Sequence, residues 1–214
     1  MIERVLHTAQ KITNKITIIS GFKAEILEAY IDQNFSQFTY CRQEEQLGTA
    51  HAVKMGADQI INDEKVLILY GDVPLIKQDT LEGVINSDGA CLLTTTLDNP
   101  TGYGRIVEDE VGHVQEIVEE KDANEHQKAI KTIFTGVMMI EGALLLDGLS
   151  EINNNNAAKE YYLTDLVAVL HNKGVKINHI KTNASEVQGA NNKNELHELE
   201  QVYRNMKSQE LLDK

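Results

Sequence analysis

Cysteine is scarce in this sequence, and its copies do not form a recognisable site. Cys41 and Cys91 are the only two among 214 residues, and both fall within apolar stretches that are typical of strands. A disulfide framework or a zinc site would need cysteines in regular, closely spaced sets. The sequence therefore favours a reduced cytosolic interior, and we assign the two thiols no role.

Long apolar runs are also lacking. No stretch approaches the roughly 18 residues that a membrane-spanning helix needs. The N-terminal stretch MIERVLHTAQ carries charge at its third and fourth residues and has no apolar segment of the secretory type. These absences predict a soluble, cytoplasmic protein without a membrane partner.

Positive charge is in deficit. The chain has 20 Lys and Arg against 33 Asp and Glu, which gives a formal net charge of -13. A nucleic-acid-binding surface needs clustered basic side chains that displace counterions from phosphates. Nucleic acid is therefore excluded as a partner, whereas a small anionic ligand remains possible if a metal ion screens its charge.

Apolar spacing indicates alternating helices and strands in the first half of the chain. Helices are predicted at 2–12, at 23–31 and from about residue 49, and strands at 16–20, 38–43, 66–70 and 91–97. Such alternation predicts an α/β fold with a mostly parallel sheet wound on both faces. The length suits one domain, residues 1–214, that buries roughly 70% of its unfolded surface.

The pattern changes in the second half. Residues 104–120, GRIVEDEVGHVQEIVEE, hold two alternating segments about Gly112, which predicts a β-hairpin inserted over one end of the sheet. A core strand at 132–140 follows. A helix through 161–173 should stop at Gly174, a short strand should occupy 175–180, and an amphipathic helix should end the chain.

Asp72 follows a strand that reads as buried on both faces. The stretch KVLILYGDVPLI is almost unbroken in apolar residues until Gly71, Asp72 and Pro74. In open α/β sheets, ligands bind at the carboxyl ends of the strands, so a carboxylate there is a candidate ligand of a metal or a nucleotide. An Asp that only starts a turn before the proline is an equally weighted alternative.

Further candidates lie in segments that have ordinary structural explanations too. Gly48 and Thr49 open a helix and could receive a phosphate or a base carbonyl, although Thr49 serving only as an N-cap is favoured. The glycines around Tyr103 could admit a ligand or make a plain turn. Asn191 could bind a hard cation, although helix capping is the commoner role of such a residue.

Seven segments, taken together in order and spacing, carry a resemblance that none of them carries alone. They are EEQLGTAHA, LYGDVPLI, DNPTGYGRIV, IVEEKDA, FTGVMMI, NNNNAAKEYYLTD and VQGANN. Over essentially its whole length the chain resembles the uridylyltransferase domain of bacterial bifunctional N-acetylglucosamine-1-phosphate uridylyltransferase/glucosamine-1-phosphate acetyltransferase. The resemblance implies a Rossmann-like nucleotide-diphospho-sugar transferase fold that uses Mg²⁺. Its implied reaction joins UTP to N-acetylglucosamine 1-phosphate, giving pyrophosphate and UDP-N-acetylglucosamine, a precursor of peptidoglycan and lipopolysaccharide.

The same resemblance implies a set of site residues. Asp72 and Asn191 would bind Mg²⁺, so that Asp72 holds the metal that bridges the nucleotide phosphates. Gln43 and Gly48 would read the uracil edge, with Gln46 and Thr49 nearby. The remaining positions would line the nucleoside, namely Tyr70 and Gly71, or surround the sugar, namely Gly104, Glu119, Tyr162 and Thr164.

Three departures from the family pattern qualify the implied function. The family begins with a strand and a glycine-rich loop that cradles the triphosphate, and no segment of this chain matches them. The domain is therefore expected to be N-terminally truncated and nearly inactive by itself. The hexapeptide pattern of the acetyltransferase half is absent as well. Phe134 stands where the family usually has Asn, and Phe cannot donate a hydrogen bond to a sugar.

Two alternatives to an active transferase therefore remain open. One is a non-catalytic module that binds a nucleotide sugar, and the other is an inactive fragment. A sheet that lacks a central strand would also expose unpaired edges, which predicts possible self-association.

Overall fold

The computed structural model describes residues 1–35, 38–190 and 193–212. The strands are β1 (Thr17–Ser20), β2 (Thr39–Arg42), β3 (Lys65–Ile68), β4 (Ala90–Thr96), β5 (Arg105–Glu108), β6 (Val114–Val118), β7 (Thr132–Glu141) and β8 (Ile177–Lys181). The α-helices are α1 (Ile2–Gln10), α2 (Ala24–Asn34), α3 (Thr49–Met55), α4 (Gln78–Ile85), α5 (Glu125–Lys128), α6 (Gly142–Glu151), α7 (Asp165–Asn172) and α8 (Lys193–Leu212). Two short 3₁₀ helices are η1 (Ala57–Gln59) and η2 (Ala184–Glu186).

The predicted α/β class is confirmed, but the main sheet is mixed. Its order is β6-β5-β7-β4-β8, and β3 pairs with β7 beside β5. β4 and β8 are parallel, whereas β7 is antiparallel to β3, β4 and β5. The predicted predominance of parallel pairs is wrong for this sheet, because among the described strands only its β4–β8 pair is parallel and every pairing of β7 is antiparallel.

The sheet buries apolar side chains on both faces, which places the core. Consecutive residues of β4 and β7 alternate between two clusters, as period-two strands must. Leu92 and Met138 pack with helices α6 and α7, while Leu93 and Met139 pack with α4. Helices α4 and α6 were not anticipated from the sequence, and each covers one of these faces.

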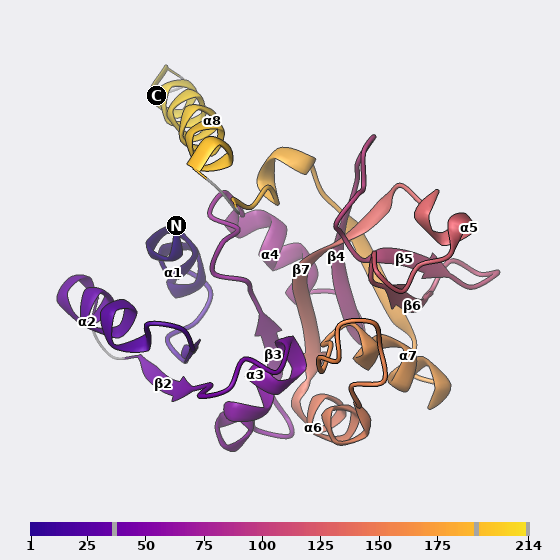
Figure 1. Ribbon diagram of the computed structural model, residues 1–214. Helices are drawn as coiled ribbons and strands as arrows, with labels where there is room; N and C mark the ends of the chain where they lie inside the picture. Colours follow the sequence, from indigo (N-terminus) through magenta and orange to yellow (C-terminus); the bar gives the residue numbers. More distant parts are fainter. Residues whose placement is uncertain (36–37, 191–192, 213–214) are drawn as a thin grey trace.

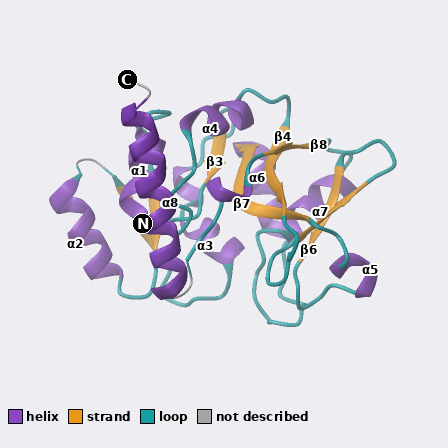
Figure 2. Cartoon of the chain, turned by 90° about the horizontal axis from the view of Figure 1, so that it is seen from above, coloured by secondary structure: helices purple, strands orange, loops and turns teal. Residues whose placement is uncertain are grey.

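A separate layer holds the N-terminal elements. β1 and β2 form a two-stranded parallel sheet, and Leu6 of α1, Ile18 of β1 and Ile31 of α2 pack together. Figures 1 and 2 show α1, α2 and α8 together on the side away from the β5–β6 hairpin and α5. The Arg4 guanidinium lies 3.2 Å from the ring centre of Tyr203, which links α1 to α8.

β3 differs from its prediction. It ends at Ile68, and its apolar residues are half-buried and not buried on both faces. Among the described strands, β3 pairs only with β7, so its second edge has no ladder. Asp72 therefore lies four residues beyond an edge strand of this sheet.

The predicted hairpin and stop signals are confirmed. Gly112 has φ +85° in the turn between β5 and β6, where Asp109 N donates to His113 O at 2.8 Å. Gly174 has φ +80° just beyond α7. Within the described residues, no helix is both long enough and apolar enough to cross a membrane.

Candidate active site

The segment between β2 and α3 holds Gln43, a predicted uracil reader, and Gln46, which was predicted to lie nearby. Gln43 Nε2 donates to Gly48 O at 3.0 Å and lies 3.0 Å from His51 Nδ1, so its amide is fixed. Gln46 is exposed, and its Nε2 donates back to Gln43 O at 3.0 Å. Within the described residues, the Oε1 atom of Gln43 therefore accepts no hydrogen bond. The Gln46 side chain instead stabilises the turn at 43–46.

Gly48 and Thr49 join this segment to a distant one. Gly48 has φ +115°, and a Cβ there would stand 2.5 Å from Tyr161 O. Leu163 N donates to Thr49 Oγ1 at 2.9 Å. The N-cap interpretation of Thr49 is wrong, because Gly48 occupies the N-cap and the threonine hydroxyl binds the 161–163 segment. Only glycine allows the two backbones to approach so closely.

Tyr70, two residues after β3, packs against the middle of β7. A Cβ on Gly136, which has φ +86°, would stand 2.6 Å from the Tyr70 ring, so the ring packs on bare backbone of β7. Burial raises the pKa of Tyr70 to about 12, and the charges of Glu119 and Asp72 act in the same direction. The hydroxyl therefore stays protonated and can donate a hydrogen bond. Gly71 packs beside Ile2 of α1.

The predicted sugar-binding residues also come together. Thr164 Oγ1 donates to Glu119 Oε1 at 2.9 Å, and a Cβ on Gly104 would stand 3.5 Å from the same oxygen. Burial is the main cause that raises the pKa of Glu119. It also raises the pKa of Tyr162, with help from Asp122 and Glu119. One oxygen of Glu119 is therefore anchored in a poorly hydrated place.

Asp72 is exposed and lies beside Gly189, two residues before Asn191 in the sequence. A Cβ on Gly189 would stand 3.4 Å from Asp72 O and 3.8 Å from its Oδ2. In the described part of the chain the Asp72 carboxylate accepts no hydrogen bond, so a turn-forming role for its side chain is not supported. Asn191 itself lies outside the described residues.

A metal ion at Asp72 would need further ligands besides the described side chains, such as water and substrate phosphates. The described residues contain no group of three or more His, Cys, Asp or Glu side chains that could hold a metal. Mg²⁺ commonly takes one or two protein oxygens and completes its shell with water and substrate phosphates. The free, exposed Asp72 carboxylate fits such a partial shell.

The sequence did not point to Arg105, the residue that holds the loop at 101–104 in place. Arg105 is 1% exposed; its guanidinium donates to Tyr103 O and to the Glu120 carboxylate. Glu120 also accepts from Gly102 N at 3.3 Å, and the hydrogen bond from Arg105 lowers the Glu120 pKa. The hairpin register, which pairs Arg105 with Val118, was the signal that could have suggested this contact.

Asp165 and Glu186 were missed as well. Burial raises the pKa of Asp165 to about 6, with repulsion from Glu119 and Asp122. Glu186, which is 7% exposed, accepts from Lys77 Nζ at 2.9 Å and from Thr80 Oγ1 at 2.7 Å. This clamp ties the segment before Gly189 to α4. Both carboxylates are recognisable only when distant segments are brought together.

Comparison with known proteins gives concordant results. A sequence model of the family described as "Nucleotidyl transferase" matches residues 1–184. A protein from Bacillus anthracis described as a glucose-1-phosphate thymidylyltransferase, solved in complex with a sucrose, superposes with a TM-score of 0.65 at 19% identity, covering 85% of this chain and 74% of that one. A UDP-glucose pyrophosphorylase complexed with UDP-glucose gives a TM-score of 0.62 at 16% identity, with 85% and 77% covered. These likenesses confirm the predicted nucleotide-diphospho-sugar transferase fold.

Proposed function

This chain belongs to the nucleotidyl transferase family, and we propose that its site takes UTP and N-acetylglucosamine 1-phosphate to form UDP-N-acetylglucosamine and pyrophosphate. One observation carries the proposal. The segment predicted to read uracil and the segment predicted to hold the sugar are bonded to each other, through Thr49 and Leu163. One elongated ligand can therefore contact both.

The uracil end would be read by Gln43 and Gly48. Because Gln43 Nε2 is engaged by Gly48 O and His51, its Oε1 is left to accept from the N–H of uracil. A pyrimidine that offers an acceptor at that position would meet an acceptor in Gln43, and the unpaired contact would weaken its binding. The fixed amide thus favours UTP over CTP.

The sugar end would be held by Glu119. Thr164 occupies its Oε1, so Oε2 can accept from a sugar hydroxyl in a poorly hydrated setting, where such a bond is strong. A Cβ at Gly104 would strike Ile117 Cγ2, at 2.8 Å, and would fill space next to that carboxylate, at 3.5 Å. Tyr162 offers a protonated hydroxyl on the same side.

Asp72 and Asn191 would bind Mg²⁺, and the ion would contact the phosphates. When bound, the ion would neutralise phosphate charge and orient the nucleotide. Attack of a sugar phosphate on the α-phosphorus of UTP needs alignment and charge neutralisation, and little covalent work by the protein. No general base is therefore assigned, and the residues of this chain bind, orient and hold hydrogen bonds.

Calorimetric titration of UDP-N-acetylglucosamine, with and without Mg²⁺, tests this proposal. We expect saturable binding that Mg²⁺ strengthens, loss of the Mg²⁺ effect in Asp72→Asn, and about tenfold weaker binding in Glu119→Gln. Asp58→Asn, an exposed Asp outside the site, is the matched control. Absence of heat at millimolar ligand, or an Mg²⁺ effect that survives in Asp72→Asn, would refute the assigned site.

A pyrophosphate-release assay then separates the enzyme from the alternative. Turnover of UTP with N-acetylglucosamine 1-phosphate above the Asp72→Asn background would support the transferase and refute the near-inactivity expected of this chain by itself. Product binding without turnover would instead assign this chain to the class of non-catalytic nucleotide-sugar-binding modules.

A further inference from the structure

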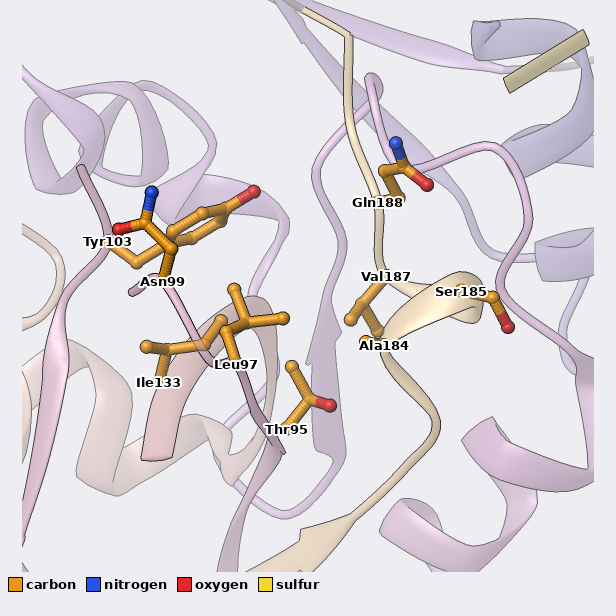
Figure 3. A pocket seen from close by; sticks show the side chains of 9 residues that line it. All are labelled: Thr95, Leu97, Asn99, Tyr103, Ile133, Ala184, Ser185, Val187 and Gln188. Atoms are coloured by element: carbon orange, nitrogen blue, oxygen red, sulfur yellow. The ribbon is translucent and has the colours of Figure 1, made fainter. Parts of the chain in front are cut away.

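A second pocket lies on the other side of the sheet from Glu119. It has a volume of about 370 Å³, within the range of small-molecule sites. One wall is the segment that follows β4 and enters β5, with Leu97, Asn99 and Tyr103, and the other is formed by η2 and the residues that follow it (Figure 3). Thr95 lies at the base between the walls.

The alternation of β7 separates this pocket from the proposed transfer site. Ile133 lines the pocket, whereas its neighbour Phe134 points to the opposite face. Phe134 packs in the cluster of Leu163, which adjoins Thr164, and Val187 packs in the cluster on the α4 face. A ligand here would not overlap one held by Glu119.

Both walls are fixed by side-chain hydrogen bonds. Glu186 anchors the second wall to α4 through Lys77 and Thr80, and Thr95 Oγ1 donates to Thr182 O at 2.9 Å. On the first wall, Arg105 donates to Tyr103 O. A pocket whose walls are held in this way exists before a ligand arrives, which lowers the entropic cost of binding.

The lining is uncharged and bears unused hydrogen-bonding groups. Leu97, Ile133, Ala184 and Val187 supply apolar surface, and the polar members are hydroxyl and amide side chains. Within the described part of the chain, neither the Tyr103 hydroxyl nor the Gln188 amide has a hydrogen-bond partner. Figure 3 shows the Tyr103 hydroxyl directed toward the wall that carries Gln188.

We propose that this pocket binds an uncharged, hydroxyl-rich ligand of about the size of one sugar ring. An anion or cation in this partly open pocket would find no counter-charge in the lining, so its partial desolvation would go uncompensated. A purely apolar ligand would leave the Tyr103 and Gln188 groups unpaired. Hydroxyls can both donate to and accept from these groups, and the faces of a sugar ring pack well against an aromatic side chain.

The site is tested with methyl α-glucopyranoside, which has no phosphate, by ligand-observed NMR titration of the full chain. We expect saturable binding that the double variant Tyr103→Phe/Gln188→Leu weakens by about tenfold, because two hydrogen bonds are removed at nearly constant volume. The double variant Tyr30→Phe/Gln59→Leu makes the same changes at exposed positions elsewhere and should bind as the parent does.

Three results would overturn the proposal. They are no saturable binding, equal binding by the pocket variant, and equal binding by glucuronate, a sugar that carries a carboxylate. A titration of Thr164→Val distinguishes this site from the transfer site. Loss of glucoside binding in that variant, with retention in Tyr103→Phe/Gln188→Leu, would place the sugar at Glu119 and refute the second pocket while leaving the proposed function intact.

Discussion

At the scale of single residues, Phe134 combines a position predicted to lie near the sugar with an apolar environment. The sequence comparison put it beside the sugar, yet its side chain is 6% exposed and packs with Ile106 and Leu163. At this position an amide would lose apolar contacts and be desolvated. In the proposed site, sugar recognition is therefore assigned to Glu119 and Thr164, and position 134 contributes packing.

Phe134→Asn is expected to lower the free energy of unfolding by about 2 to 4 kcal/mol, as measured by urea denaturation. Phe134→Leu, which keeps the site apolar, should cost about 1 kcal/mol. If the Asn variant kept its stability and bound UDP-N-acetylglucosamine more tightly, position 134 would face the ligand after all.

Asp165 gives a pH-dependent prediction. Its pKa is raised to about 6 in the folded chain, against about 3.9 when unfolded. The folded state therefore binds this proton more tightly, so the group lowers stability above pH 6, and that loss disappears as the pH falls toward about 4. Glu119 and Asp122 face it and contribute the repulsion.

Asp165→Asn should therefore stabilise the chain by on the order of 1 kcal/mol near pH 8 and by nothing near pH 4. Thermal melts across this range measure the difference. Asp58→Asn, at an exposed site, should show no such trend. A stabilisation by Asp165→Asn that grew as the pH fell would contradict the raised pKa.

At the scale of an element, β7 makes room for the Tyr70 ring. Between the pairs Leu92–Met138 and Thr94–Phe134, one residue of β4 faces three residues of β7. Gly136 lies in this bulge with φ +86° and carries no Cβ that would strike Tyr70. The bulge in this central strand thus lies directly against Tyr70, a residue of the proposed nucleotide site.

Gly136→Ala should cost about 2 kcal/mol or more, from left-handed backbone strain and displacement of Tyr70, and should weaken UDP-N-acetylglucosamine binding. Denaturation and calorimetry test the two effects. Gly83→Ala is the matched control, because this glycine lies inside α4 with only Ile180 Cδ1 near, at 3.9 Å; it should stabilise the helix by roughly 0.5 to 1 kcal/mol. Equal effects of the two substitutions would exclude a special role for the bulge.

The second element-scale feature is the Glu186 clamp. It fixes the segment that leads to Gly189, which lies beside Asp72. Glu186→Gln replaces two charge-assisted bonds by weaker ones, so we expect a loss of about 1 to 2 kcal/mol and faster amide hydrogen exchange at 184–190. Glu82→Gln, on the exposed side of α4 and bonded only to Gln78 in the described contacts, should change neither. Unaltered exchange in Glu186→Gln would show that the clamp is dispensable.

For the molecule as a whole, two features act in opposite directions on self-association: unpaired strand edges favour it, and a large net charge opposes it. Among the described strands, β1 pairs only with β2 and β3 only with β7, and Phe22 and Ile26 are largely exposed. Such edges and apolar groups favour association. The net charge of -13 repels like chains until salt screens it.

Self-association should therefore increase with salt. Sedimentation velocity is expected to show a higher average mass at ~1 M than at ~0.01 M NaCl, because the screening length falls from about 30 Å to about 3 Å. Association that weakened as salt was added would indicate an ion-paired interface and exclude the apolar one described above.

Local sequence patterns were sufficient to predict the elements that periodicity and backbone chemistry dictate. Alternating apolar residues indicated β5 and β6, Gly112 and Gly174 marked turns that need positive φ, and the run before Asp72 indicated a strand. These signals are local, since each depends on neighbours within a few positions. The order of the seven segments was sufficient to indicate the fold and the candidate site residues.

The direction of β7, the half-burial of β3 and the partners of the site residues follow from contacts between distant segments. The bond from Leu163 to Thr49 and that from Thr164 to Glu119 each join segments far apart in the chain, as do the contacts of Glu186 with Lys77 and Thr80. Burial and charge at Asp165 arise from the same convergence. Such properties depend on which surfaces exclude water from one another, and no local pattern specifies that.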